Sequence, residues 1–312
     1  MTEYSIRPYA DEDAETIAHI ENAIRVQCGA EPAMTAADTR SLVGAWIRDR
    51  STDTRVVLSR NGAVVAGGFV MPPPEGGERA SIYAGVHPDA QGRSIGRDLM
   101  TWQLDRVRDI HAQLAPGHGW HIETGASADN APAIRLFERR GFEPVRYFFD
   151  MVAPLNGSTP AVELPDGIAS MPYAEHMSRA LYDAHMEAFE DHWGFQRRPY
   201  ERWIIGSVGA EDFRPDLSRI AFDGDEIAAY VLAYDGINGR EYIGQVGTRR
   251  PWRKRGLASA LIAESLVAGA EAGKSGASLG VDAANPTGAV GVYERLGFAV
   301  NHKFVTYQRS LE

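Results

Sequence analysis

The chain has 312 residues, a length that suits two domains of about 150 residues each. Its hydrophobic fraction of 44% and charged fraction of 24% are those of folded globular proteins and exclude wholesale disorder. Lys and Arg number 32 against 42 Asp and Glu, so the net charge of −10 argues against a dedicated nucleic-acid-binding protein. The single cysteine, Cys28, excludes an internal disulfide, and no Cys/His cluster has the spacing of a metal site.

The N-terminal segment lacks the apolar core of a signal peptide, and no run of about 18 apolar residues occurs, so we expect a cytoplasmic protein. A short strand near residues 6–7 leads into a helix after Asp11, in which Ile17, Ile20 and Ile24 lie on one face. A hairpin with an Asn-Gly turn follows, and then strands alternate with helices. The strands expected in this half lie at 55–59, 63–70, 81–86, 120–124 and 145–152.

The chain then repeats itself, which is the main signal of its organisation. The segment 130–142 (NAPAIRLFERRGF) resembles 285–298 (NPTGAVGVYERLGF), and ahead of each a strand runs into a Gly/Arg-rich turn and a helix. The strands expected in the second half lie at 219–222, 227–234, 242–248, 278–282 and 298–308. The order β-α-β-β-β-α-β-α-β in each half predicts an α/β (α+β) fold, a mixed sheet with helices on its faces.

Residues 152–167 separate the two copies. This segment has prolines at positions 154, 160 and 165 and no helical period, which is typical of a linker. We therefore expect an N-terminal domain over residues 1–153, a linker over 154–166 and a C-terminal domain over 167–312.

The turn Arg253–Ala258 (RKRGLA) has the features of an anion site. It joins a strand to a helix, and the first turn of a helix leaves backbone N–H groups unpaired at the positive end of the helix dipole. Gly256 allows the close approach of a bulky anion, and three consecutive cations add attraction. The arrangement suits a pyrophosphate, whereas the GxGxxG and GxxxxGK[ST] patterns of other nucleotide sites are absent.

These motifs resemble those of the GNAT superfamily of acyl-CoA-dependent N-acyltransferases, and they do so twice. The pyrophosphate loop of that family, Q/R-x-x-G-x-G/A, matches Arg253–Ala258 at every specified position and Gln91–Gly96 at all but Ser94. The Asn-initiated helix of the family, which ends in Y-x-x-x-G-F, matches 285–298, whereas Phe137 replaces the tyrosine in the first copy. The resemblance covers nearly the whole chain outside the linker, and the tandem layout is most similar to mycothiol synthase and related actinobacterial two-domain acetyltransferases.

The resemblance implies acetyl-CoA, or another acyl-CoA, as the cofactor, and no metal. Backbone N–H groups on the strand before each loop would hold the acyl group and pantetheine, and the loop would hold the pyrophosphate. In the second half the implied cofactor-binding residues are Val246, Gly247, Thr248, Arg253, Lys254, Arg255, Gly256, Leu257, Ala258 and Asn285. In the first half they are Val86, Gln91, Gly92, Arg93, Ser94, Ile95, Gly96 and Asn130.

Acyl transfer to an amine needs a base for the amine, donors for the oxyanion and an acid for the departing thiolate. The resemblance implies that Tyr293 is this acid. Its alternative interpretation is a tyrosine that packs on the sheet. Because Phe137 has no proton to donate, we expect a first half that is degenerate in catalysis and a second half that is catalytic.

The base is harder to assign from the sequence. Glu241, at the start of the central strand, is either a base or a solvated carboxylate at a strand end. His192 titrates near neutral pH and is a second candidate. On the helix before His192, three carboxylates form an acidic stripe that is either a solvated face or an attraction for a cationic amine: Asp183, Glu187 and Glu190.

The leading interpretation is an N-acetyltransferase that moves the acetyl group of acetyl-CoA directly to a primary amine of a small molecule. The alternatives are a CoA-binding pseudoenzyme or sensor, and an acyltransferase that uses a longer acyl-CoA in antibiotic or thiol biosynthesis. The partner expected is a small-molecule amine, with neither nucleic acid nor membrane. We expect a monomer of two pseudo-symmetric domains, with a homodimer as the alternative.

Overall fold

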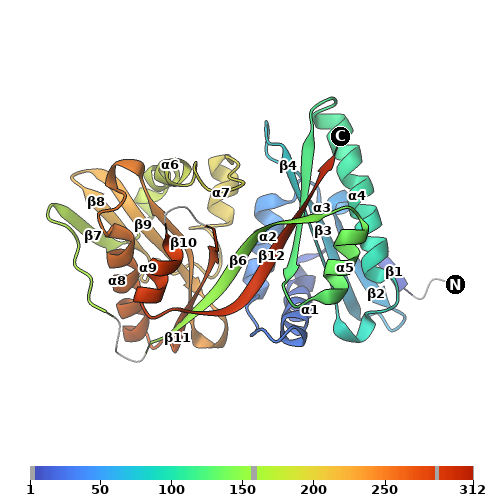
Figure 1. Cartoon of the computed structure of the whole chain (residues 1–312), viewed down its shortest axis with the longest axis horizontal. Coiled ribbons are helices and arrows are strands. Elements are labelled where there is room, and N and C mark those ends of the chain that lie inside the picture. The colour runs from blue at the N-terminus through green and yellow to red at the C-terminus, as the bar shows by residue number, and fades with distance from the viewer. Residues whose placement is uncertain (1–3, 156–159, 285–287, 312) are drawn as a thin grey trace. The chain divides into compact units, whose positions relative to one another are not determined.

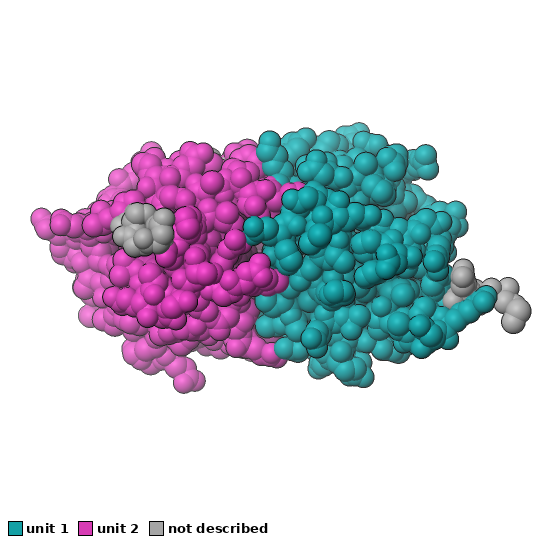
Figure 2. Space-filling view, turned by 90° about the horizontal axis from the view of Figure 1, so that it is seen from below, with its two compact units in different colours: residues 1–147, 303–312 teal, residues 148–302 magenta. Residues whose placement is uncertain are grey.

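The structure is a computed structural model that describes residues 4–155, 160–284 and 288–311 (Figure 1). The chain divides into two compact units, which Figure 2 shows in different colours. Unit 1 consists of residues 1–147 and 303–312, and unit 2 consists of residues 148–302. Each unit contains a mixed sheet with helices packed on both faces, which confirms the predicted fold class.

In unit 1 the strand order is β1-β2-β3-β4-β5-β12, with β4 and β5 parallel and the other neighbours antiparallel. The strands are β1 (Tyr4–Arg7), β2 (Thr54–Ser59), β3 (Val64–Met71), β4 (Arg79–Val86), β5 (Trp120–Ser127) and β12 (Ala299–Leu311). The helices are η1 (Asp11–Asp13), α1 (Ala14–Gln27), α2 (Ala36–Trp46), α3 (Arg50–Asp53), η2 (Pro88–Ala90), α4 (Ile95–Leu114) and α5 (Ala131–Arg139). A Cβ on Gly67 of β3 would meet Ile17 of α1, and one on Gly68 would meet Leu99 of α4. Because successive strand residues point to opposite faces, α1 and α4 cover opposite faces of this sheet.

In unit 2 the order is β6-β11-β10-β9-β8-β7, with β10 and β11 parallel. The strands are β6 (Glu143–Pro154), β7 (Ile168–Pro172), β8 (Arg219–Asp223), β9 (Glu226–Asp235), β10 (Glu241–Thr248) and β11 (Gly276–Asp282). The helices are η3 (Glu175–Met177), α6 (Ser178–Ala188), α7 (Tyr200–Ile205), η4 (Ile237–Gly239), η5 (Arg250–Trp252), α8 (Leu257–Glu271) and α9 (Ala289–Arg295). One buried cluster joins α6 and α7 to Tyr230 of β9, and another joins α8 and α9 to Ile243 of β10. The two helix pairs therefore cover opposite faces of the sheet.

The strands that close the two halves of the sequence are exchanged between the units. Residues 304–311 of β12 pair antiparallel with residues 120–127 of β5, and residues 148–154 of β6 pair antiparallel with 276–282 of β11. The repeat predicts that a closing strand exists, but it contains no information on which of two similar strand edges that strand will join. The division into 1–153, 154–166 and 167–312 stays a prediction. The boundaries of the two compact units instead fall within the closing strands, after residue 147 in β6 and after residue 302 in β12.

The central pair of strands separates along its length in both units. In unit 2, β10 pairs with β11 only over 241–243, and in unit 1, β4 pairs with β5 only over 79–81. Strand β10 also has an irregularity between Ile243 and Gln245 against β9, typical of a β-bulge. Beyond this point the edge of β10 that faces β11 has no strand partner among the described residues, and this edge forms part of the site described next.

Candidate active site

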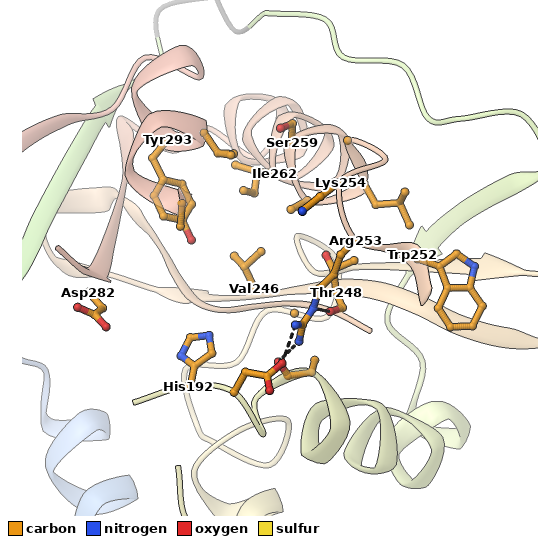
Figure 3. Close-up of a pocket in the computed structure, with 18 of the residues that line it drawn as sticks. His192, Val246, Thr248, Trp252, Arg253, Lys254, Ser259, Ile262, Asp282 and Tyr293 are labelled. Carbon is orange, nitrogen blue, oxygen red and sulfur yellow. Dashed lines mark hydrogen bonds and ion pairs between the residues drawn. The ribbon is translucent and has the colours of Figure 1, made fainter. Parts of the chain in front are cut away.

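A pocket of about 550 Å³ opens in unit 2 where β10 and β11 separate (Figure 3). This volume is in the range of small-molecule sites. The predicted cofactor-binding residues that line it are Val246, Gly247, Thr248, Arg253, Lys254, Gly256, Leu257 and Ala258. His192 and Tyr293 line the same pocket, so the structure brings two of the three predicted catalytic residues to the predicted loop and strand.

The loop before α8 is shaped by two left-handed residues, Lys254 at φ 62° and Gly256 at φ 85°. A Cβ on Gly256 would meet nothing within 4 Å, so this glycine relieves backbone strain and not a steric clash. Gly256 provides no side-chain cap for α8, which begins at Leu257. The backbone N–H groups of the first turn of α8 are therefore suited to an anion.

The loop of unit 1 has the same backbone form with a different sequence. Its left-handed residues are Gly92 at φ 75° and Ser94 at φ 68°, and α4 begins at Ile95. Asn130 caps α5 by accepting a backbone hydrogen bond at 3.2 Å, which is a structural role. Its predicted counterpart, Asn285, lies outside the described residues. The other predicted residues of unit 1 lie at the end of β4 or within the loop and the first turn of α4: Val86, Gln91, Arg93 and Gly96.

The side chain of Arg253 is bound to the protein itself. Its Nε donates to the carbonyl of Thr248 at 3.1 Å, its Nη2 to the carbonyl of Ala188 at 3.0 Å, and its Nη1 to the carboxylate of Asp191 at 2.7 Å. The motif suggests a direct phosphate contact for this arginine, whereas the structure gives it a supporting position in the wall. The side chain of Arg255 is 40% exposed and is not part of the pocket lining.

Tyr293 comes from α9, and its hydroxyl points into the pocket (Figure 3). The side chain is largely buried and packs edge-on against Phe298, with 6.0 Å between the ring centroids. Burial raises the pKa of Tyr293 to about 12, so the phenol keeps its proton at neutral pH and is available as a donor.

His192 follows α6 and faces the pocket on the side of Asp282, at the end of β11 (Figure 3). Its ring stacks on that of Phe189 with 4.3 Å between the centroids. Burial lowers the pKa of His192 below its ordinary value of 6.5, and the charge of Asp282 opposes this shift. The imidazole is therefore neutral at pH 7 and can accept a proton. Asp282 was not identified from the sequence, because a lone aspartate at a strand end has no distinctive pattern.

Glu241, the other candidate base, does not reach the pocket. It is fully buried at the far end of β10, roughly 16 Å along the strand from Val246 at about 3.3 Å per residue. Its carboxyl group lies against α8, where a Cβ on Gly269 would come within 2.8 Å of it, and neither oxygen has a hydrogen-bond partner among the described residues. Burial raises the pKa of Glu241 from 4.5 to about 8. This position argues against both sequence interpretations, the direct base and the solvated strand-end carboxylate.

Two carboxylates of the predicted acidic stripe, one on α6 and one just after it, are paired with arginines. The carboxylate of Glu187 lies 2.6 Å from Arg249, and that of Glu190 lies 3.0 Å from Arg250. Asp183 is exposed on the helix surface. The stripe thus connects α6 to the segment before α8, and its paired charges do not support the idea that it attracts a cationic amine.

Comparison with known proteins identifies the family. Residues 178–298 match the model of the Acetyltransferase (GNAT) family, and residues 52–144 match that of an Acetyltransferase (GNAT) domain. A mycothiol acetyltransferase of Thermobispora bispora is 30% identical over 82% of this chain and 83% of its own length. The chain belongs to the GNAT acetyltransferase family. It is an acyl-CoA-dependent N-acyltransferase with two GNAT domains, which confirms the resemblance seen in the sequence.

Other GNAT proteins agree with this assignment. A mycothiol acetyltransferase of Tsukamurella paurometabola is 28% identical over 79% of this chain and 84% of its own length. The crystal structure of a GCN5-related N-acetyltransferase from Sphaerobacter thermophilus matches with a TM-score of 0.78 and 28% identity, covering 99% of this chain and 96% of that one. A tandem GNAT protein from the clavulanic acid biosynthesis pathway has the same fold, with a TM-score of 0.68, 18% identity, and coverage of 99% and 98%.

Two further observations concern metal sites and membrane-spanning helices in the described part of this GNAT chain. Within residues 4–155, 160–284 and 288–311, no group of three or more His, Cys, Asp and Glu side chains is arranged to hold a metal ion. Over the same residues, none of the helices is both long enough and apolar enough to span a membrane.

Proposed function

We propose that this chain transfers the acetyl group of acetyl-CoA to a primary amine of a small molecule, and that unit 2 carries out the reaction. The observation that supports this most directly is the pocket in which the loop 253–258, the open edge of β10, Tyr293 and His192 meet. In unit 1 the counterpart of Tyr293 is Phe137, which is buried against aromatic rings and has no proton to donate. Unit 1 is accordingly a copy that is degenerate in catalysis.

The residues of this pocket fit an acyl-CoA. The left-handed loop and the first turn of α8 suit the pyrophosphate, and Lys254 adds positive charge. The edge of β10 from Gly244 to Thr248 is not paired with β11, so its backbone groups are suited to the amides of pantetheine. Ile262 and Val292 supply an apolar wall. When bound, the acetyl thioester supplies an electrophilic carbonyl carbon and a thiolate leaving group.

The side chains divide the proton transfers between them. His192, neutral at pH 7, accepts the proton that the amine loses as it attacks. Backbone N–H groups among Val246, Gly247 and Thr248 donate to the carbonyl oxygen as it gains negative charge. Tyr293 donates its phenolic proton to the departing sulfur, since a pKa of about 12 keeps the phenol protonated.

The acceptor class is supported by the relatives and by the pocket wall. Because the relatives are named mycothiol acetyltransferases, the amine of a thiol precursor is the first acceptor class to test. The wall near His192 is formed by Trp193 and Asp282, a combination of aromatic and acidic groups that suits a polar, cationic amine. The rates of transfer from acetyl-CoA and from a longer acyl-CoA, measured side by side, show which acyl chain the enzyme prefers.

The decisive experiment is Tyr293→Phe, which removes one oxygen and leaves the packing almost unchanged. The value of kcat should fall roughly 10²- to 10⁴-fold, with little change in acetyl-CoA affinity. Thiol release over an amine panel measures the rate, and calorimetry measures the affinity.

Gly256→Pro and Gly92→Pro each disable one loop, because each places proline at a left-handed glycine, the first in unit 2 and the second in unit 1. Only Gly256→Pro should abolish acetyl transfer. A wild-type protein that binds CoA but releases no thiol with any amine is a pseudoenzyme and refutes the proposal. Full turnover by Tyr293→Phe together with loss of turnover in Gly92→Pro would move the reaction to unit 1.

A further inference from the structure

The loop of unit 2 is joined to the end of α6 by ion pairs on one carboxylate. Arg253 donates from Nη1 to Oδ2 of Asp191 at 2.7 Å (Figure 3). Arg250 donates from Nη2 to Oδ1 of Asp191 at 2.6 Å and from Nε to Oδ2 at 3.1 Å. We call these three residues the α6–loop junction. The junction connects the helix that precedes His192 with the loop that precedes α8.

Unit 1 has an equivalent of the loop side of this junction. Gln91 stands five residues after Val86, the last residue of β4, as Arg253 stands five residues after Thr248, the last residue of β10. Each donates to the backbone carbonyl of that strand residue, Gln91 at 3.3 Å and Arg253 at 3.1 Å. The two side chains therefore occupy the same place in their units.

Unit 1 also has an equivalent of the helix side. Gln27 stands 14 residues after the end of η1, and Asp191 stands 14 residues after the end of η3. Gln27 and Gln91 exchange amide hydrogen bonds of 3.1 and 3.4 Å. The chain thus joins helix and loop in the same way in both units. The pair is neutral in unit 1, which has Phe137 in place of the tyrosine, and charged in unit 2, which has Tyr293.

The residue after Asp191 is His192, and the residue that opens the loop is Arg253. We propose that the α6–loop junction positions His192 relative to the cofactor loop, so that Arg253 and Asp191 are positioning residues for proton transfer and not ligands of the CoA phosphates. The inference rests on the proposed function, in which His192 is the base. The hydrogen bonds of Arg253 support the positioning role, because each of its three side-chain nitrogens already donates to a protein acceptor.

The exposure of the pair indicates what kind of effect to expect. The side chain of Arg253 is 27% exposed and that of Asp191 is 45% exposed, so their ion pair adds little to folding stability. A misplacement of about 1 Å in a reacting group, in contrast, can slow a reaction by roughly 100-fold. Loss of the junction should therefore appear in kcat and not in the unfolding temperature or in the KM for acetyl-CoA.

The test compares Arg253→Gln, Asp191→Gln and the double variant, which copies the Gln27–Gln91 pair of unit 1. Each single variant should lower kcat roughly 10- to 100-fold and leave the KM for acetyl-CoA within about threefold. The double variant should regain most of the lost rate. The control is Arg214→Gln, which breaks ion pairs of 2.6 and 2.8 Å elsewhere in unit 2 and should leave kcat unchanged.

The pKa of His192, followed by NMR, separates position from charge. The charge of Arg253 lowers the pKa of His192 and the charge of Asp191 raises it, so the single variants should shift it in opposite directions. Positioning predicts that kcat on the pH plateau falls in both variants. The proposal is overturned if the plateau kcat of the single variants is unchanged and only their pH profiles are displaced. It is also overturned if the fold-loss of kcat in the double variant equals the product of the fold-losses in the two single variants.

A second readout does not depend on turnover and uses the full chain. Addition of CoA should shift the His192 ring signals in the wild type and the double variant and fail to do so in the single variants. If all four proteins show the same shift, the junction does not position His192. If the wild type shows the shift but no amine-dependent thiol release, the proposed function fails while the junction stands. Thermal unfolding checks each variant, and Asp191→Asn replaces Asp191→Gln if the latter does not fold.

Discussion

Replacing Glu241 by glutamine should make unit 2 more stable, and increasingly so as the pH rises. The carboxyl group is fully buried, has no hydrogen-bond partner at either oxygen within the described part of the chain, and has a pKa raised from 4.5 to about 8. Burial is the main cause; the charges of Lys274, Arg219 and Arg214 oppose it without cancelling it. The folded state therefore keeps a proton that the unfolded state loses.

The direction and size of the effect follow from proton linkage. Because the folded pKa is raised, the unfavourable contribution of Glu241 is absent below pH 4.5, grows as the pH rises, and is complete above about pH 8. At about 1.36 kcal/mol per pKa unit, the raised pKa of Glu241 destabilises the fold by about 3 kcal/mol at pH 7, where the folded state must keep the proton, and by at most about 5 kcal/mol above pH 8, where the buried group ionises. Glutamine removes the titration and keeps the shape of the side chain.

Urea unfolding of wild type and Glu241→Gln at pH 5, 7 and 8.5 measures this difference. The two proteins should be within about 1 kcal/mol at pH 5 and should diverge by about 3 kcal/mol at pH 7. Glu271→Gln, at an exposed carboxylate on the same helix α8, is the matched control and should change little. An equal stability of wild type and Glu241→Gln at pH 8.5 would refute the reasoning. Acetyl transfer at pH 7 should be unchanged, and a large loss of kcat would return Glu241 to the role of base.

Two further predictions concern Arg255, in the loop before α8, and His192, in the pocket. Arg255→Ala should weaken CoA binding about tenfold at low salt and less at high salt, because this guanidinium, 40% exposed in the loop before α8, would attract the phosphates through a charge-assisted interaction that salt screens. Calorimetry at two salt concentrations tests this, and an unchanged Kd contradicts it. His192→Asn should lower kcat roughly 10²- to 10⁴-fold. Because burial lowers the pKa of His192, the acidic limb of the wild-type pH–rate profile should lie below pH 6.5. A limb above pH 6.5 would exclude His192 as the base.

The local features of the site could be predicted from the sequence because local chemistry determines them. A strand that runs into a Gly/Arg-rich turn and a helix leaves the backbone N–H groups of the first helical turn unpaired, and five of the six residues of the turn 253–258 line the pocket of unit 2. The position of Tyr293 follows in the same way, since it lies on a helix fixed by its own motif. The repeat likewise predicted two similar units with mixed sheets, which the family matches confirm.

Features that depend on distant parts of the chain were not predictable. Glu241 is polar and lies at the start of a strand, which suggests solvent, but α8 covers it from a position 28 residues later at Gly269. Arg253 fits a phosphate motif, but its partner Asp191 comes from another helix. The exchange of β6 and β12 is of the same kind, because β6 pairs with β11 and β12 pairs with β5, strands that lie far away in the sequence.

The two loops show what each unit has retained. Both have two left-handed residues in the same order, and in each loop only one of the two is glycine: Gly92 before Ser94 in unit 1, and Lys254 before Gly256 in unit 2. A left-handed residue other than glycine costs about 1–2 kcal/mol, so each loop keeps one strained residue. Unit 1 keeps this strain although its counterpart of Tyr293 is Phe137, which has no hydroxyl group. We infer that the loop form serves a purpose other than protonation of a thiolate, and a pyrophosphate site that holds the cofactor without chemistry would account for it.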